Sequence, residues 1–147
     1  MPRYPDLDRV PLYRTIEHTA DIGIEVQAPD QAGIFVKSAL ALADLMFGLD
    51  AIEPVEQRTL VSEGDTVEEL LVAWLNDVLC VVAVEGVVFS RFTDARLEGT
   101  RFSARGWGEK PDPALHAAEM EIKAATYHGL SFLRTEGGWT ARIILDV

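Results

Sequence analysis

Hydrophobic residues recur along the chain at two different spacings, and the spacing separates predicted helices from predicted strands. A first helix is predicted after Asp30, which can accept hydrogen bonds from the free amides of a helix start. Gly48 can end this helix just after Phe47. One face of the helix is apolar, as packing on a sheet requires. The residues on that face are Phe35, Ala39, Leu42, Ala43 and Met46.

A second helix is predicted to begin after Thr66, where the sequence has the form of a capping box. In such a box the Thr66 and Glu69 side chains satisfy the first free amides reciprocally. The helix is predicted to end near Val84, before Gly86. Its apolar stripe has the spacing of a core face, which explains it more simply than a binding groove does. The stripe consists of Leu70, Leu71, Trp74, Leu75, Val78 and Leu79.

Apolar residues two apart predict a strand over residues 22–26, buried on one face. Asp21 falls on the polar side of this strand, together with Gly23 and Glu25. A short strand is also predicted near residues 58–62. Both strands flank predicted helices, so we expect a sheet that packs against them.

The second half of the chain is predicted to consist mainly of antiparallel strands. Two glycine-containing turns are predicted, at residues 98–100 and 136–138, and each separates two strand-like segments. Residues 114–120 fit either a short turn of helix or an irregular segment, and the pattern does not decide between them. The predicted strands cover residues 87–89, 95–97, 101–105, 130–135 and 139–147.

These elements indicate a single α+β domain in which antiparallel β-sheet packs with two main α-helices. A chain of 147 residues is long enough to bury one sizeable core. Helices and strands do not alternate regularly, as they would around a parallel sheet. Three prolines among charges mark residues 1–12 as a partly ordered N-terminal arm, so the domain is expected over residues 13–147.

The charge balance argues against direct binding of RNA. Thirteen Lys and Arg residues face 24 Asp and Glu residues, which gives a formal net charge of −11. A field of this sign repels phosphate backbones, so any work on RNA is expected to proceed through another protein. The carboxylates suit hard cations or a basic patch on a partner, and they equally suit a surface that is charged for solubility.

The single cysteine, Cys80, lies in an apolar run, where a thiol is expected to be buried as a small hydrophobic group. One cysteine excludes an intrachain disulfide, and the first residues lack the apolar stretch of a secretory signal. No apolar run approaches the roughly eighteen residues that a membrane span needs. A cytoplasmic location with no membrane contact is therefore expected.

Two segments contain oxygen ligands that could bind a metal ion. The sequence EHTADIG, at residues 17–23, contains His18 and Asp21, although these could simply be a hydrogen-bonded loop residue and a turn former. At the other end of the chain, Asp146 is followed by Val147 with its free α-carboxylate. If the last strand lies beside the first, Asp21 and Asp146 can meet in a site for Ca²⁺ or Mg²⁺. The alternative is a solvated, frayed terminus.

A third segment, EIKAATYHG at residues 121–129, carries Lys123 and His128. Such groups can hold a phosphate or contact a partner, or they can form a surface ion pair and a turn. The chain lacks a GxxxxGK[ST] loop, a GxSxG elbow and a CxxC pair, which are common signatures of nucleotide hydrolysis, serine hydrolysis and structural zinc. A metal-dependent hydrolase stays open, because carboxylates near a metal can form a hydrolytic site.

Several segments together resemble the archease family, and the resemblance covers nearly the whole chain from Tyr13 onward. The matching sequences, in order, are EHTADIG, EELLVAWLNDVL, EIKAATYHGL and IILDV. This resemblance implies a cofactor of the RtcB-type RNA-splicing ligase, which joins RNA ends that bear a cyclic phosphate or 3′-phosphate and a 5′-hydroxyl. It further implies that the chain promotes guanylylation of the ligase histidine by GTP and multiple turnover, in tRNA splicing or RNA repair.

The resemblance also implies particular residues and an accessory role without catalysis by the chain itself. It places a divalent cation, usually described in this family as Ca²⁺, at Asp21, Asp146 and Val147. His18, Lys123 and His128 become candidates for contact with the ligase, its metal centre or a phosphate. The segment over 113–120 is less distinctive, so His116 receives no role. Two alternatives are a stand-alone metal-dependent hydrolase and a general protein chaperone or modulator.

Overall fold

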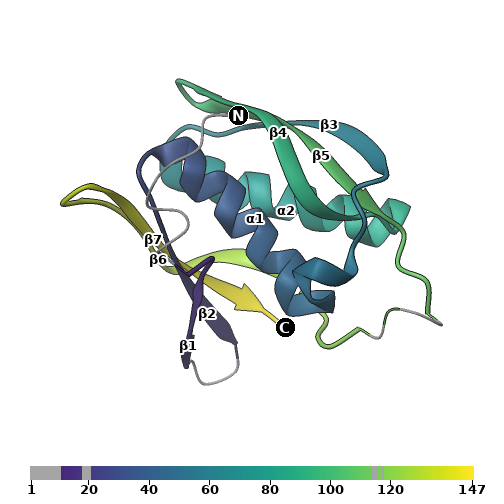
Figure 1. Cartoon of the computed structure of the whole chain (residues 1–147). Helices are drawn as coiled ribbons and strands as arrows, with labels where there is room; N and C mark the ends of the chain where they lie inside the picture. Colours follow the sequence, from purple (N-terminus) through teal and green to yellow (C-terminus); the bar gives the residue numbers. More distant parts are fainter. Residues whose placement is uncertain (1–10, 18–20, 114–115, 117) are drawn as a thin grey trace.

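The computed structural model describes residues 11–17, 21–113, 116 and 118–147, and the described chain forms three layers. Two helices, α1 (Gln31–Phe47) and α2 (Val67–Glu85), lie between two antiparallel sheets (Figure 1). The four-stranded sheet has the order β1 (Arg14–Glu17), β2 (Ile22–Ala28), β7 (Gly138–Asp146) and β6 (Ala124–Thr135). The three-stranded sheet has the order β3 (Glu56–Glu63), β5 (Arg101–Glu109) and β4 (Val88–Glu98). The expected α+β domain with two main helices is confirmed.

The limits of α1 are those that its sequence predicts. The Asp30 carboxylate accepts a hydrogen bond of 2.7 Å from the amide of Gly33 at the start of the helix. At the end, Gly48 has a φ of 81° and its amide donates to the carbonyl of Asp44. A short 3₁₀ turn, η2 (Leu49–Ala51), follows. Both helix-end predictions rest on local hydrogen bonds, which explains why the sequence alone was sufficient.

The capping box at the start of α2 is present, with one correction. Thr66 Oγ1 accepts from the amide of Glu69 at 3.1 Å, as predicted. The Glu69 carboxylate, however, accepts from the amide of Asp65 at 3.1 Å and not from that of Thr66. The helix ends at Gly86, whose φ of 75° is left-handed. The box therefore ties the helix to the loop one residue earlier than expected.

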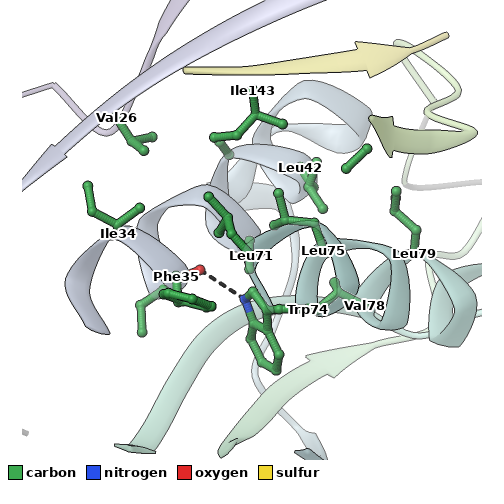
Figure 2. Packing of buried hydrophobic residues seen from close by; sticks show 14 of the residues in the cluster. Val26, Ile34, Phe35, Leu42, Leu71, Trp74, Leu75, Val78, Leu79 and Ile143 are labelled. Atoms are coloured by element: carbon green, nitrogen blue, oxygen red, sulfur yellow. Dashed lines mark hydrogen bonds between the residues drawn. The ribbon is translucent and has the colours of Figure 1, made fainter. Parts of the chain in front are cut away.

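A hydrogen bond between the two helices lies at the centre of the core. Trp74 Nε1 on α2 donates to the carbonyl of Phe35 on α1 at 3.0 Å, and both side chains are fully buried (Figure 2). Phe102 from the three-stranded sheet stacks on Phe35 with ring centroids 4.6 Å apart, and meets Trp74 edge-on at 4.7 Å. Phe132 from the other sheet lies 6.1 Å from the Phe35 ring. One aromatic cluster thus joins all three layers.

Three strand predictions need correction. The segments predicted over 87–89 and 95–97 are parts of the single strand β4, which begins at Val88. Two register shifts against β5 interrupt its alternation, and Asp94, at a φ of 56°, lies in the second. Strand β1 was not predicted, because its four residues are too few to show a pattern. The last hairpin is confirmed, but β6 begins at Ala124 and not at residue 130.

The prediction that Cys80 is buried is wrong, because the structure places this thiol at the surface. Two residues along a helix rotate the side chain by about 200°, so Cys80 lies away from the face that buries Val78. An apolar run of four or five residues cannot show this, because it necessarily passes around the whole helix.

The segment over 113–120 contains no helix or strand among its described residues, and residues 114, 115 and 117 lie outside them. Of the predicted arm over 1–12, the structure describes only Pro11 and Leu12, so the domain boundary at residue 13 stays a prediction. Neither helix in the described chain combines the length and hydrophobicity needed to cross a bilayer.

The role of Trp74 can be tested by the substitution Trp74→Phe. This change removes the indole donor and leaves a small cavity between the layers, so we expect a loss of about 2–3 kcal/mol in the free energy of unfolding. The measurement is urea denaturation monitored by circular dichroism. Val84→Ala on the same helix is the control: Val84 is 78% exposed, and its loss should change stability by less than about 0.5 kcal/mol. Equal stability losses in the two variants would contradict the central place given to Trp74.

Candidate functional site

The pairing of β2 with β7 brings the EHTADIG segment near the start of the domain beside the IILDV segment at its end. Ile22 lies opposite Leu145, and the two strands are antiparallel. Asp21 directly precedes β2 and Asp146 is the last residue of β7, so one further step of this register sets Asp21 opposite Asp146. Opposite residues in a sheet have Cα atoms about 4.5–5.5 Å apart. The strand arrangement on which the predicted meeting depended is therefore present.

Strand β6 adds a third element on the other side of β7. Ala124 lies opposite Asp146, and the amide of Lys123 donates to the carbonyl of Asp146 at 2.8 Å. Asp146 and Lys123 are exposed, whereas Asp21 is partly buried. Val147 follows Asp146 directly and is 37% exposed. The candidate site is thus the end of the four-stranded sheet at which Asp21, Lys123, Asp146 and Val147 gather.

The two remaining predicted residues are His18 and His128. His18 falls outside the described residues. His128 lies in an irregular part of β6 where residues 127–130 face the single residue Ile143 of β7. Ile143 is three residues from Asp146, which is about 10 Å along a strand. His128 itself is exposed. A contact role for these two histidines stays a prediction.

The donor set favours a hard cation over a transition metal. Within the described residues, no three side chains of His, Cys, Asp or Glu are grouped closely enough to hold a metal ion. An ion at this site would therefore rely on the Asp21 and Asp146 carboxylates, supplemented by Val147, main-chain carbonyls or water. Six to eight oxygen ligands of this kind suit Ca²⁺, and they lack the sulfur and nitrogen that zinc sites use. The residues present therefore fit the expected cation.

An apolar contact behind the site explains why glycine follows Asp21 so closely. A Cβ atom at Gly23 would lie 3.1 Å from Ile16 Cβ and 3.2 Å from Ile144 Cδ1. Ile144 alternates with the buried Ile143 and Leu145 and so lies on the outer face of the sheet, yet it is only 4% exposed. Gly129, whose φ is 66°, covers the same side chain, and its Cβ position is 3.3 Å from Ile144 Cγ1. The two glycines let neighbouring strands close over Ile144.

A charged cluster joins three strands on the same outward face. Glu25 on β2 accepts from Arg14 on β1 at 2.6 Å and from Arg142 on β7 at 3.3 Å. Burial raises the pKa of the Glu25 carboxyl, but hydrogen bonds and attraction from the two guanidinium groups outweigh it and lower the pKa overall. Glu25 therefore stays ionised and bridges β2, which directly follows Asp21, and β7, which ends at Asp146.

Asn76 is a supporting residue that the sequence analysis did not identify. Its amide group forms two hydrogen bonds with the backbone of Ala125, donating to the carbonyl at 3.1 Å and accepting from the N–H at 2.8 Å. Ala125 is next to Ala124, which pairs with Asp146. The sequence feature that could have indicated this role is the asparagine itself, because helix interiors disfavour asparagine and this one lies within an apolar helix. Asn76 fixes the start of β6, and with it the edge of the site.

Sequence comparison places this chain in a family. Residues 13–147 match the model of the archease protein family (MTH1598/TM1083). A protein archease from Methanopyrus kandleri is 36% identical over 92% of this chain and 99% of its own length. The protein archease of Pyrococcus abyssi is 35% identical over 89% of this chain and 95% of its own. The chain belongs to the archease family.

Solved structures agree with this placement. Protein 1598 of Methanobacterium thermoautotrophicum has a TM-score of 0.79 to this chain and 27% sequence identity, and the match covers 92% of this chain and 98% of that one. A Thermotoga maritima structure described as an archease and possible chaperone has a TM-score of 0.64 at 23% identity, over 91% and 96% of the two chains. The second likeness supports the fold alone.

The substitution Asn76→Ala tests whether one side chain holds β6 in place. It leaves the N–H and the carbonyl of Ala125 without their partner, so we expect a loss of about 2–4 kcal/mol in unfolding free energy. The substitution should also speed solvent exchange of the Ala125 amide more than that of amides elsewhere in the chain. Cys80→Ser, at an exposed position of the same helix, is the control. Unchanged exchange at Ala125 would show that β6 does not depend on Asn76.

Proposed function

We propose that this chain is an accessory activator of an RtcB-type RNA-splicing ligase, and that the end of the four-stranded sheet is the part that acts on the ligase. The observation that carries the proposal is the convergence of Asp21 and Asp146 beside Lys123 in a member of the archease family. Three strands and both ends of the domain sequence contribute to this point. The role would be to promote guanylylation of the ligase histidine and multiple turnover, in tRNA splicing or RNA repair.

A divalent cation, most readily Ca²⁺, is the proposed cofactor at Asp21, Asp146 and Val147. Carboxylates that face each other across two strands repel, and a bound cation removes this repulsion. When bound, the ion would supply positive charge against the phosphates involved in nucleotidyl transfer. The chain's own contribution is to hold these oxygen atoms at the rigid end of a sheet, with the Lys123 backbone fixed beside them.

The charge of the chain supports a protein partner over RNA. At a net charge of −11, the surface would be attracted to a ligase surface built to bind RNA phosphates, and would itself be repelled by RNA. Contact with RNA would therefore be indirect, through the ligase, and the pair would act in the cytoplasm. The Lys123 side chain, together with His18 and His128, is proposed to contact the ligase or a phosphate.

Two other functions remain as competing proposals. A stand-alone metal-dependent hydrolase would use the same carboxylates, and it predicts turnover of phosphoesters without any ligase. A general chaperone is suggested by the description of the Thermotoga maritima structure, and it predicts that the chain suppresses aggregation of unrelated proteins. We favour the activator, without catalysis of its own, because the carboxylates lie at one sheet end and the acidic surface suits one basic partner.

The metal proposal predicts a loss of Ca²⁺ affinity when either carboxylate is neutralised. Asp21→Asn and Asp146→Asn should each weaken binding by about tenfold or more, which corresponds to about 1.4 kcal/mol or more. Isothermal titration calorimetry at neutral pH measures the affinity. Glu136→Gln is the matched control, because Glu136 lies in the turn before β7, at the opposite end of the strand from Asp146. If Glu136→Gln and Asp146→Asn weakened binding equally, general charge and not a defined site would explain the affinity.

The activator proposal predicts that Asp146→Ala slows guanylylation of a cognate RtcB-type ligase. At limiting amounts of this chain, with GTP and Mn²⁺ present, the rate should fall by about tenfold or more, because one of the three proposed cation ligands is lost. Transfer of labelled guanylate to the ligase measures the rate. Glu136→Ala, which removes the same charge at the far end of β7, should act like the unsubstituted chain. Unchanged activation by Asp146→Ala would sink the proposal.

A further inference from the structure

The connection between β5 and β6 crosses from one sheet to the other past the end of α1 (Figure 1). Its described residues are 110–113, 116 and 118–123, and none of them lies in a helix or strand. Two backbone hydrogen bonds of 2.8 Å attach it to its surroundings: Glu119 N–H donates to Met46 O on α1, and Lys123 N–H donates to Asp146 O. The connection therefore ends inside the candidate site.

A third attachment uses a side chain, the imidazole of His116, which the sequence analysis left without a role. Its Nδ1 accepts from the amide of Asp112 at 2.8 Å, and its Nε2 lies 2.8 Å from the carbonyl oxygen of Ala51 in η2. The His116 amide also donates to the carbonyl of Asp112 at 2.6 Å. The side chain is only 9% exposed. The imidazole thus links the connection to the segment that follows α1.

The partners of the two ring nitrogens define the protonation state of His116. An amide donor faces Nδ1 and a carbonyl acceptor faces Nε2, so the ring must be neutral and carry its hydrogen on Nε2. The Glu109 carboxylate lies 3.8 Å from Nε2 and also accepts from the amide of Glu53. Because both nitrogens are engaged, His116 is not available as a metal ligand or a general base in this arrangement.

We infer that His116 is a positioning residue for the candidate site. It holds the connection against η2 so that the last residues of the connection reach β7 in one arrangement. Ile122, only 6% exposed, and the Lys123 bond to Asp146 complete that arrangement. Without the imidazole, the connection would lose its described bond to η2 and would keep only the Glu119 N–H bond to the end of α1 among its described bonds to this region. A longer unattached loop has more conformations to lose before Lys123 can settle beside Asp146.

The test compares two substitutions in the full-length chain. His116→Gln can keep a donor toward Ala51, whereas His116→Leu keeps much of the bulk and neither hydrogen bond. We expect His116→Leu to speed amide exchange at Glu119 and Lys123 by about tenfold or more, with α2 amides unchanged. Ca²⁺ affinity, measured with the metal alone, should fall by about tenfold, and His116→Gln should restore part of both properties. Lys110→Ala, at an exposed position of the same connection, is the control.

The ring itself gives an independent readout. Nitrogen-15 chemical shifts of the unsubstituted chain should show His116 with its hydrogen on Nε2, and a hydrogen on Nδ1 would overturn the inference. Unchanged exchange at Lys123 in His116→Leu would also overturn it, as would faster exchange with unaltered Ca²⁺ affinity. If amides throughout the chain exchange faster in His116→Leu, that variant has lost global stability. The decision then falls to His116→Gln, whose exchange at Lys123 and Ca²⁺ affinity should lie close to those of the unsubstituted chain if the inference is right.

The inference rests on the proposed function only in the choice of site, and the two can fail separately. Exchange and imidazole shifts need no ligase, so they test the positioning role even if the chain activates none. Conversely, normal activation of the ligase by His116→Leu at limiting concentration would overturn the positioning role and leave the activator proposal intact.

Discussion

The hydrogen bond from the Trp74 indole to the Phe35 carbonyl fixes how closely the two helices approach, and both sheets pack against that helical layer. Phe102 and Phe132 reach the Phe35 ring from opposite sheets, so a shift of either helix would disturb both outer layers. A buried indole N–H without an acceptor would cost about 1–3 kcal/mol, which makes this one arrangement strongly preferred. The register of the sheets is thus built on a closely packed helical layer.

The candidate site depends on that register more than on any single loop. Asp21 and Asp146 lie at the ends of neighbouring antiparallel strands, and a register slip of one residue would turn either side chain to the other face of the sheet. Asn76 connects α2 to β6 on the inner side, while Glu25 bridges the strands on the outer side. Side-chain hydrogen bonds therefore hold the strand side of the site on both faces of the sheet, and the connection that carries His116 has an attachment of its own.

Local signals in the sequence predicted local structure well, and their limits are physical. Asp30, Gly48 and Thr66 act on hydrogen bonds within a few residues, so the helix ends could be predicted. The long strand β4 was divided in two because bulges shift the phase of its alternation. The meeting of Asp21 and Asp146 could be predicted only on the condition that the first and last strands pair, since no local pattern reveals which strands are neighbours. The roles of Asn76 and His116 could not be predicted, because their partners Ala125 and Ala51 lie 49 and 65 residues away in sequence.

The most direct test of the central claim, that this archease acts on a ligase through the end of its four-stranded sheet, is a turnover experiment. A cognate RtcB-type ligase in large molar excess would be mixed with GTP, Mn²⁺ and a small amount of the unsubstituted chain, and the guanylylated ligase would be counted over time. If the sheet end acts on the ligase, each molecule of the chain should support guanylylation of more than one ligase molecule. Equal progress with and without the chain, using a ligase of proven activity, would contradict it.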